Sequence, residues 1–363
     1  MSNTQSQKSH PISHPKYVVN FESKIIIMRL LFTALACLSS VSVFGQQTLN
    51  DSLLVDGIYR HFITYIPSTY QQSQTTPLVF NFHGRTSSAQ AQMWYGDFRN
   101  IADTAKFILV HPQGLLDNTG VTHWNIGQST VDDIGFINEL YQYVLSNYNI
   151  DIEKVYSTGM SNGGNFSYLL ACSMSDKFAA IASVTGSMWP HLIQVTCNPS
   201  HPTPVLEIHG TSDLIVPYNS ALDAIEYWRN YNNCDLNPIT TSIQDVNTED
   251  NSVVEHIVYD NGDHGVTTEL FKITNGGHTW PGTSFPNGVT NYDIDASLEI
   301  WKFFSKYDIN GALNEVSSIT NHNINKQVVK ILDVLGREAN QTTNQILFYI
   351  YDDGSVEKKF IVE

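Results

Sequence analysis

Short apolar runs alternate with amphipathic stretches through the middle of this chain. The runs that we interpret as buried strands lie at 107–110, 155–157, 180–184 and 205–208, and helical periodicity follows them, for example at 218–230. Strands that alternate with helices predict an α/β fold, in which helices cover both faces of a mostly parallel sheet. Catalytic groups in such a fold lie at the carboxyl ends of the strands.

The segment 155–164, Val-Tyr-Ser-Thr-Gly-Met-Ser-Asn-Gly-Gly, contains the most specific chemical signal. Gly159 and Gly163 flank Ser161 in the pattern G-x-S-x-G, between a predicted strand and a predicted helix. This context is that of a nucleophile elbow, whose tight turn requires small residues two positions before and after the serine. We predict that Ser161 is a nucleophile and that the N–H of Asn162, at the helix N-terminus, binds an oxyanion.

An α/β-hydrolase supplies its catalytic triad in the chain order serine, acid, histidine. Asp213 follows the predicted strand at 205–208, and His278 follows a short strand at 269–273 and a Gly-Gly turn. Both residues are expected on loops that converge on Ser161. We predict that His278 is the general base and that Asp213 fixes its tautomer.

Other residues remain alternatives for these roles. Asp213 could merely close an Asx-turn, in which case Asp260 or Asp263 would be the acid. Most of the chain's 13 histidines are expected to be structural, and His83, His111, His209 and His264 all border apolar runs.

The apolar strand at 78–82 leads into His83-Gly84-Arg85, the position of the second oxyanion donor in this fold. We predict that the backbone N–H of Arg85 is that donor. We predict that His83 belongs to the substrate-binding residues, and we interpret it as an architectural residue beside the loop rather than a base. Asp132 and Asp133 are expected to begin a helix, because carboxylates favour a first helical turn. We find no ligand spacing for a metal and no phosphate-binding loop, so neither metal nor cofactor is expected.

Tryptophans mark the expected active-site side of the sheet. Trp94, Trp124, Trp189 and Trp280 lie in or beside predicted loops. Aromatic rings there suit a sugar, a hydroxycinnamoyl group or an apolar polyester, and we predict Trp94, Trp124 and Trp280 as substrate-binding residues. The alternative is that each ring packs into the core.

Several motifs in one order extend the signal over residues 56–307. They include 77–84, 111–114, 159–164, 209–213 and 277–282. Together they resemble the secreted esterase family of polyhydroxybutyrate depolymerases, feruloyl esterases and acetyl xylan esterases. The resemblance implies an α/β-hydrolase with its triad at Ser161, Asp213 and His278. Arg85 departs from the pattern, since a smaller or uncharged residue is usual there; its guanidinium either reaches a polar oxygen of the substrate or is solvated.

Charge narrows the range of partners. The 363 residues include 19 basic and 35 acidic side chains, for a formal net charge of −16. Phosphates would be repelled, so nucleic acid and anionic membranes are not expected partners. A neutral extracellular polymer suits this charge, and we expect a monomer with no membrane span.

The first 45 residues predict an export signal. Met28 and Arg29 precede the apolar run at 30–38, which is too short to span a bilayer. We predict cleavage before Gln46 and a true start at Met28; a lipid anchor at Cys37 is a minor alternative. Of the remaining cysteines, three pairings are possible, and we favour the one that joins Cys172 to Cys197 over those that use Cys234.

The chain changes character after its predicted catalytic domain, residues 46–308. Residues 309–325 are rich in Asn, Ser and Thr and predict a linker, and residues 326–363 contain short strands and turns. This tail resembles the sorting domain of the type IX secretion system, with a β-sandwich-like fold and a Lys-Lys-Phe-Ile-Val end. The alternative is a small β module that binds polymer.

These observations predict a secreted serine esterase that works through an acyl-enzyme on an extracellular ester-bearing polymer. The candidate substrates are a hydroxyalkanoate polyester and feruloyl or acetyl esters of polysaccharide. After export and outer-membrane translocation by the type IX machinery, the enzyme is either released or attached to the cell surface. A serine peptidase on the same fold and a non-catalytic polymer-binding module are the alternatives.

Overall fold

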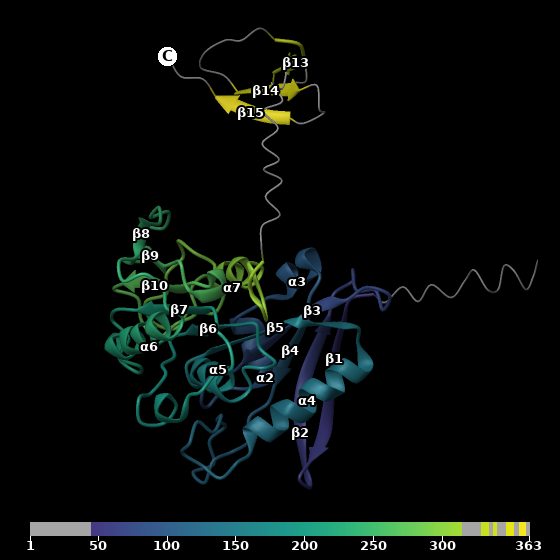
Figure 1. The fold of residues 1–363 in the computed structure, drawn as a ribbon, viewed down its shortest axis with the longest axis vertical. Coiled ribbons are helices and arrows are strands. Elements are labelled where there is room, and N and C mark those ends of the chain that lie inside the picture. Colours follow the sequence, from purple (N-terminus) through teal and green to yellow (C-terminus); the bar gives the residue numbers. More distant parts are fainter. Residues whose placement is uncertain (1–44, 314–327, 334–336, 340–345, 352–355, 361–363) are drawn as a thin grey trace, which may run out of the picture.

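The computed structural model describes residues 45–313, 328–333, 337–339, 346–351 and 356–360. All but the last residue of the predicted export segment, 1–45, and residues 314–325 of the predicted linker, 309–325, therefore lie outside the described residues. Within the described part, one large sheet carries helices on both faces, and a small sheet is formed near the C-terminal end of the chain (Figure 1).

Six parallel strands form the centre of the large sheet, in the order β4-β3-β5-β6-β7-β10. Their bounds are β3 Thr76–Phe82, β4 Ile108–Pro112, β5 Ile150–Met160, β6 Ala180–Val184, β7 Val205–Gly210 and β10 Thr268–Thr274. Antiparallel strands complete both edges: β1 Gln47–Val55 and β2 Ile58–Ile66 on one side, β9 Val253–Tyr259 and β8 Ile239–Ser242 on the other. The predicted α/β fold with a mostly parallel sheet is confirmed.

Alternate side chains of the buried strands pack into two separate cores, one on each face of the sheet. Phe80 of β3 packs with one core and its neighbour Val79 with the other, because successive side chains of a strand point to opposite faces. Helices α4 (Asp133–Asn147), α5 (Asn162–Ser173) and α6 (Tyr218–Tyr231) cover the first core. Helices α3 (Arg99–Ala105) and α7 (Ala296–Phe304) cover the second. Helix α2, Ala89–Tyr95, follows β3.

The two acidic residues at the start of α4 have structural partners. Asp132 is the N-cap, and its side chain accepts from the N–H of Gly135. Asp133 is buried, where it forms an ion pair with Arg60 of β2 and accepts from the N–H of Asn125. The predicted helix start is therefore confirmed, and one of its carboxylates also anchors β2, which lies between β1 and β4 in the sheet.

The large domain continues a few residues into the segment assigned to the linker. The short strands β11 (Tyr307–Asp308) and β12 (Gly311–Ala312) pair with each other, and the N–H of Ile309 donates to the carbonyl of Glu153. The predicted boundary at 308 cuts through this hairpin, because the Asn- and Gly-rich turn carries no apolar pattern that would reveal it.

The described residues of the tail form an antiparallel sheet. Its strands are β13 (Val328–Leu332), β14 (Ile346–Tyr351) and β15 (Val356–Phe360), in the order β13-β14-β15. The expected small β structure near the C-terminal end is present, and its described residues form one sheet of three strands. The predicted disulfide is confirmed: Cys172 pairs with Cys197, while Cys234 is buried and unpaired.

Candidate active site

Ser161 stands at the turn between β5 and α5. Its backbone has φ 53° and ψ −115°, a strained conformation for a residue other than glycine. The turn is closed by backbone contact, because a Cβ on Gly159 would lie 2.6 Å from the carbonyl oxygen of Phe82, and one on Gly163 would collide with that same oxygen. The two glycines thus allow β3 to approach the elbow, and the serine is displayed at the sheet's carboxyl edge.

The residues predicted as acid and base are in direct contact. Nδ1 of His278 lies 2.7 Å from Oδ2 of Asp213. The other carboxylate oxygen, Oδ1, accepts from the N–H groups of Ile215 at 2.8 Å and Val216 at 2.9 Å. Burial alone would raise the pKa of Asp213, but the hydrogen bond and charge of His278, together with these N–H groups, outweigh it and lower that pKa. A carboxylate anion is thus held against the imidazole. The alternative acids are not placed there: no hydrogen bond or ion pair of the described residues joins Asp260 or Asp263 to His278.

Backbone contacts hold the loop that leads to Asp213 against the loop that leads to His278. The N–H of Ser212 donates to the carbonyl of Gly276, and the N–H of Thr211 donates to that of Ile273. A Cβ on Gly210 would collide with the carbonyl of Gly276, so the two loops meet only because β7 ends in glycine.

Two backbone N–H groups beside Ser161 have no protein acceptor within the described chain, those of Asn162 and Arg85. The N–H of Asn162 belongs to the first turn of α5, where no intrahelical acceptor exists. Gly84 lies over the serine, since a Cβ on it would come within 3.6 Å of the Cβ of Ser161. Both N–H groups predicted as oxyanion donors are therefore available.

His83 is fully buried and holds in place the loop that contains Gly84 and Arg85, here called the oxyanion loop. Its Nδ1 lies 2.7 Å from the carbonyl oxygen of Gly84, and its Nε2 accepts from the N–H of Gly114 at 2.9 Å. These partners require a neutral ring with the hydrogen on Nδ1, and burial lowers the pKa of His83 to about 4. His83 does not line the cavity at Ser161, so its assignment as a substrate-binding residue was wrong and its architectural interpretation is the one observed.

Two of the tryptophans predicted to bind substrate are core residues. Trp124 is 1% exposed and packs edge-on against Phe82 and stacked on Phe166. Trp280 is 1% exposed and donates from its indole nitrogen to Ser297 of α7. Their prediction as substrate-binding residues was wrong, because both loops fold back over the sheet and bury these rings.

The guanidinium of Arg85 points away from the serine. It forms an ion pair with Asp117 at 2.5 Å and is half exposed. This contact corresponds to neither expected role of the side chain. Arg85 is nevertheless among the residues that line the cavity at Ser161.

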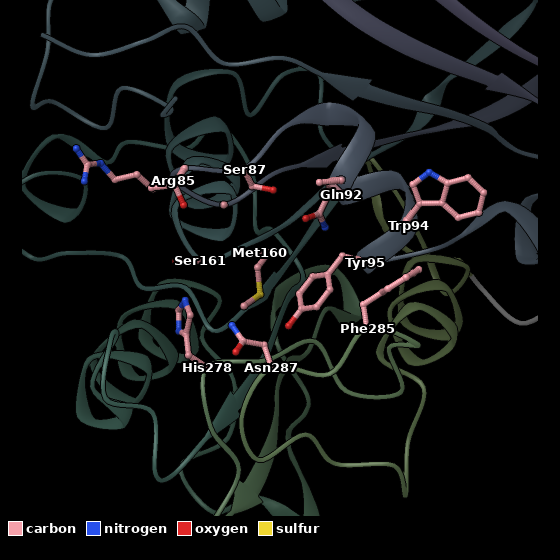
Figure 2. A pocket seen from close by; sticks show the side chains of 13 residues that line it. Arg85, Ser87, Gln92, Trp94, Tyr95, Met160, Ser161, His278, Phe285 and Asn287 are labelled. Atoms are coloured by element: carbon pink, nitrogen blue, oxygen red, sulfur yellow. The ribbon is translucent and has the colours of Figure 1, made fainter. Parts of the chain in front are cut away.

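A cavity of about 770 Å³ contains Ser161 and His278. Figure 2 shows these two residues toward one end and Trp94 and Phe285 toward the other, with Met160 between them. Trp94 is 46% exposed, so the prediction that it borders the substrate site is consistent with its position. Most of the other lining residues were missed by sequence reasoning, among them Tyr95, Phe285 and Asn287. They lie in α2 and in the loop after His278, and no local pattern indicates that these segments face each other.

The described part of the chain contains neither a metal-binding cluster nor a helix able to cross a membrane. No group of three or more His, Cys, Asp or Glu side chains there is arranged to hold a metal ion. No helix among the same residues has the length and apolar character needed to cross a membrane.

Comparison with known proteins relates this chain to esterases. Residues 125–260, which include Ser161 and Asp213, match the family model described as Phospholipase/Carboxylesterase. The chain is 26% identical over 268 residues to the bifunctional acetylxylan esterase/xylanase XynS20E of Neocallimastix patriciarum, covering 74% of this chain and 36% of that protein. It is 28% identical over 218 residues to the probable feruloyl esterase C of Aspergillus niger, covering 56% of this chain and 76% of that protein. The chain thus spans about a third of the bifunctional relative.

A solved structure extends the comparison to the fold. The acetyl xylan esterase from Aspergillus awamori superposes with a TM-score of 0.54 at 15% sequence identity, covering 72% of this chain and 99% of that one. At this identity the likeness concerns the fold, and the large domain has the α/β-hydrolase fold.

Proposed function

We propose that this protein is a serine carboxylic ester hydrolase that works through an acyl-enzyme. The observation that carries the proposal is the shared cavity, which is lined both by Ser161 on its strained turn and by His278, whose Nδ1 is held by the buried carboxylate of Asp213. The similarity to feruloyl and acetylxylan esterases supports the same chemistry.

The steps follow from the roles of these groups. The Oγ of Ser161 attacks the acyl carbon while Nε2 of His278 takes its proton, and the oxyanion is bound by the N–H groups of Asn162 and Arg85. As the intermediate collapses, the C–O bond breaks and His278 returns the proton to the departing alcohol. Water then attacks the acyl-enzyme with the same base, and the acid product and free Ser161 are released.

The shape of the cavity favours an aromatic acyl group. An acetyl group would leave most of the 770 Å³ empty, whereas a hydroxycinnamoyl group extends from Ser161 toward the exposed rings of Trp94 and Phe285. We therefore propose feruloyl esters of polysaccharide as the first substrate class. Acetyl esters and hydroxyalkanoate polyesters share the chemistry and are outcomes of the test.

Export is part of the proposal. A disulfide forms and persists in oxidising compartments, which fits the apolar leader predicted at 28–45. The three-stranded tail is proposed to act as a type IX sorting signal. Deletion of residues 314–363 is then expected to leave esterase activity unchanged and to retain the enzyme inside the cell envelope; normal release of the truncated chain would refute the sorting role.

The function is tested by initial rates of the purified protein on methyl ferulate, an acetylated xylan and a hydroxybutyrate trimer. Ser161→Ala serves as the blank and is expected to lose roughly 10⁶-fold in kcat. Serine-dependent release from the ferulate supports the proposal, whereas release from the xylan or trimer alone reassigns the substrate. If none is cleaved but a peptide amide is, the chain is a peptidase on this fold, and if neither is cleaved the esterase assignment fails.

A further inference from the structure

A second histidine–carboxylate pair lies buried beneath the triad, and the proposed mechanism does not use it. Glu207 and His209 are two residues apart on β7, so their side chains point to the same face of the sheet. Both are fully buried, and Nδ1 of His209 lies 2.8 Å from Oε1 of Glu207. Neither residue lines the cavity at Ser161, so neither contacts the substrate.

The other ring nitrogen of His209 contacts both ends of the acid loop, residues 213–216. Nε2 lies 2.9 Å from the carbonyl oxygen of Val216 and 3.4 Å from Oδ2 of Asp213. Because a carbonyl oxygen only accepts, Nε2 carries a hydrogen and donates it. The N–H of Val216 in turn donates to Oδ1 of Asp213 at 2.9 Å. One imidazole therefore closes the loop whose first residue orients His278.

Glu207 connects this pair to the helix that follows the nucleophile. Tyr168 of α5 donates its hydroxyl to Oε2 of Glu207 at 2.8 Å, and its side chain is fully buried. Continuous hydrogen bonds thus run from α5 through Glu207 and His209 to the acid loop. The position of Asp213 is in this way fixed relative to the helix that begins at Ser161.

Burial of this pair is costly, which argues against a purely stabilising role. Burial raises the pKa of Glu207; it alone would lower the pKa of His209, but the hydrogen bond and charge of Glu207 outweigh it and raise that pKa. The ring of Tyr218 on α6, with centroids 6.1 Å apart, also faces His209. An apolar pair of similar size is often at least as stable as a buried ion pair, so the polar groups suggest a demand for fixed geometry.

We propose that His209 is a positioning residue that holds the Asp213–Val216 loop. It thereby fixes the carboxylate that orients His278 relative to α5, the helix that follows Ser161. The proposal rests on the proposed function, since it concerns the same triad. The Nε2–H group, which donates to the carbonyl of Val216, is the part of His209 that positions the loop. Glu207 and Tyr168 hold the imidazole ring in place.

Two amide variants separate this donor from the rest of the side chain. Gln in His209→Gln is long enough to place its NH₂ where Nε2 stands, whereas the shorter Asn in His209→Asn reaches Glu207 but leaves Val216 without its donor. We expect His209→Asn to lower kcat/KM roughly 10- to 100-fold, as small misplacements of a catalytic group do. His209→Gln should stay within about 3-fold of the wild-type value.

The pH profile provides a readout that a merely structural role would not move. A carboxylate held against an imidazole favours the protonated, charged form of the imidazole. In His209→Asn the displaced carboxylate of Asp213 should favour it less, so the acid limb of kcat/KM should shift to lower pH by about 0.5 to 1 unit. The matched control is His256→Asn, because His256 pairs with the buried Glu269 at 2.7 Å on β9 and β10, apart from the acid loop. It should lower the unfolding midpoint without moving the limb.

The rate of inactivation by a fluorophosphonate reagent gives a second measure that needs no knowledge of the substrate. If the wild-type protein neither cleaves an ester nor reacts with this reagent, the proposed function and the role of His209 both fail. If the wild-type protein reacts but His209→Asn matches it in rate and in acid limb, only the role of His209 is overturned. Equal losses in His209→Gln and His209→Asn would also overturn it, because the donor would then be irrelevant.

Discussion

The side chain of Asn162 bonds both backbone groups of Trp124. Its Oδ1 accepts from the N–H of Trp124 at 2.7 Å, and its Nδ2 donates to the Trp124 carbonyl at 3.1 Å. The indole nitrogen of Trp124 donates to the carbonyl of His83 at 3.0 Å. One residue of a distant loop therefore ties the start of the nucleophile helix to the oxyanion loop, which fixes the distance between the two proposed oxyanion donors.

Asn162→Ala tests this connection. The backbone N–H remains, but the two hydrogen bonds to Trp124 are lost, and each contributes about 0.5–1.5 kcal/mol to stability. We expect kcat to fall by roughly 10- to 100-fold through misplacement of the donors, with KM little changed. Asn162→Asp retains the acceptor alone and should give an intermediate loss. Wild-type kcat in the alanine variant would show that the elbow is positioned without this contact.

Trp94 and Trp124 should respond in opposite ways to substitution. Trp94 is exposed at the cavity, so Trp94→Ala should raise KM for an aryl ester by roughly 2- to 12-fold, the equivalent of about 0.5–1.5 kcal/mol of ring contact, at unchanged stability. Trp124 is buried, so Trp124→Ala should destabilise the fold by about 3–5 kcal/mol. Urea denaturation and steady-state kinetics on both variants measure the contrast; a KM effect confined to Trp124→Ala would contradict the assignment.

Stability should fall as the pH drops from about 6.5 toward 4. Burial lowers the pKa of His83 to about 4 and that of His111 to about 3, whereas both take up a proton near pH 6.5 in the unfolded chain. Protons then bind the unfolded state preferentially, which costs about 2 kcal/mol per histidine at pH 5. His111→Leu should remove the part of this loss of stability that His111 causes. The free energy of unfolding, measured by urea denaturation, should then differ less between pH 7.5 and pH 5. An unchanged difference between the two pH values would mean that His111 is protonated in the folded protein.

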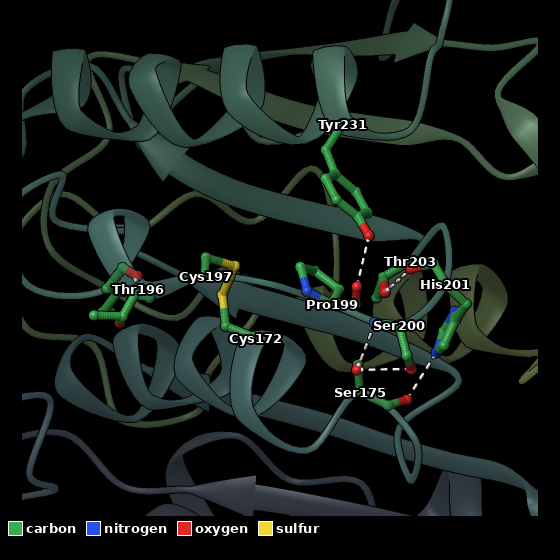
Figure 3. The surroundings of a disulfide bond; sticks show 10 residues. Cys172, Ser175, Thr196, Cys197, Pro199, Ser200, His201, Thr203 and Tyr231 are labelled. Atoms are coloured by element: carbon green, nitrogen blue, oxygen red, sulfur yellow. Dashed lines mark hydrogen bonds between the residues drawn. A yellow bond between two sulfur atoms is a disulfide. The ribbon is translucent and has the colours of Figure 1, made fainter.

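The disulfide should stabilise the domain. It closes a loop with a sequence separation of 25 between the end of α5 and the segment that follows the short helix at Gln194–Thr196. Figure 3 shows the same segment held by further contacts, including the hydroxyl of Tyr231 on the carbonyl of Pro199. Loop-closure entropy predicts a loss of about 3.5 kcal/mol when the bond is removed.

The double variant Cys172→Ser/Cys197→Ser measures this loss without leaving a reactive partner. Cys234→Ser is the control that keeps the bond, and reductant should lower the unfolding midpoint of the wild-type protein and of this control alike. A double variant as stable as the wild type would show that the hydrogen bonds of Pro199 and its neighbours hold the segment by themselves.

The features that depend on local pattern could be predicted from the amino-acid sequence. The parallel strands, the helix that begins at Asp133 and the elbow around Ser161 follow from apolar periodicity, capping residues and the spacing of two glycines, all of which act within a few residues. Asp213 and His278 could be predicted as candidates because each follows a strand that the pattern reveals, and parallel strands bring their carboxyl ends to one edge of the sheet.

Which side chains these loops expose depends on contacts between segments that are far apart in the chain. Trp94 and Trp124 look alike in sequence, yet one is exposed and the other buried, because that depends on how loops far apart in the chain fold against each other. The pair of Glu207 and His209 lies within an apolar strand, and only the contacts with Tyr168 and Val216 distinguish it from ordinary buried polar residues. Such contacts join residues up to 39 positions apart, so no local pattern encodes them.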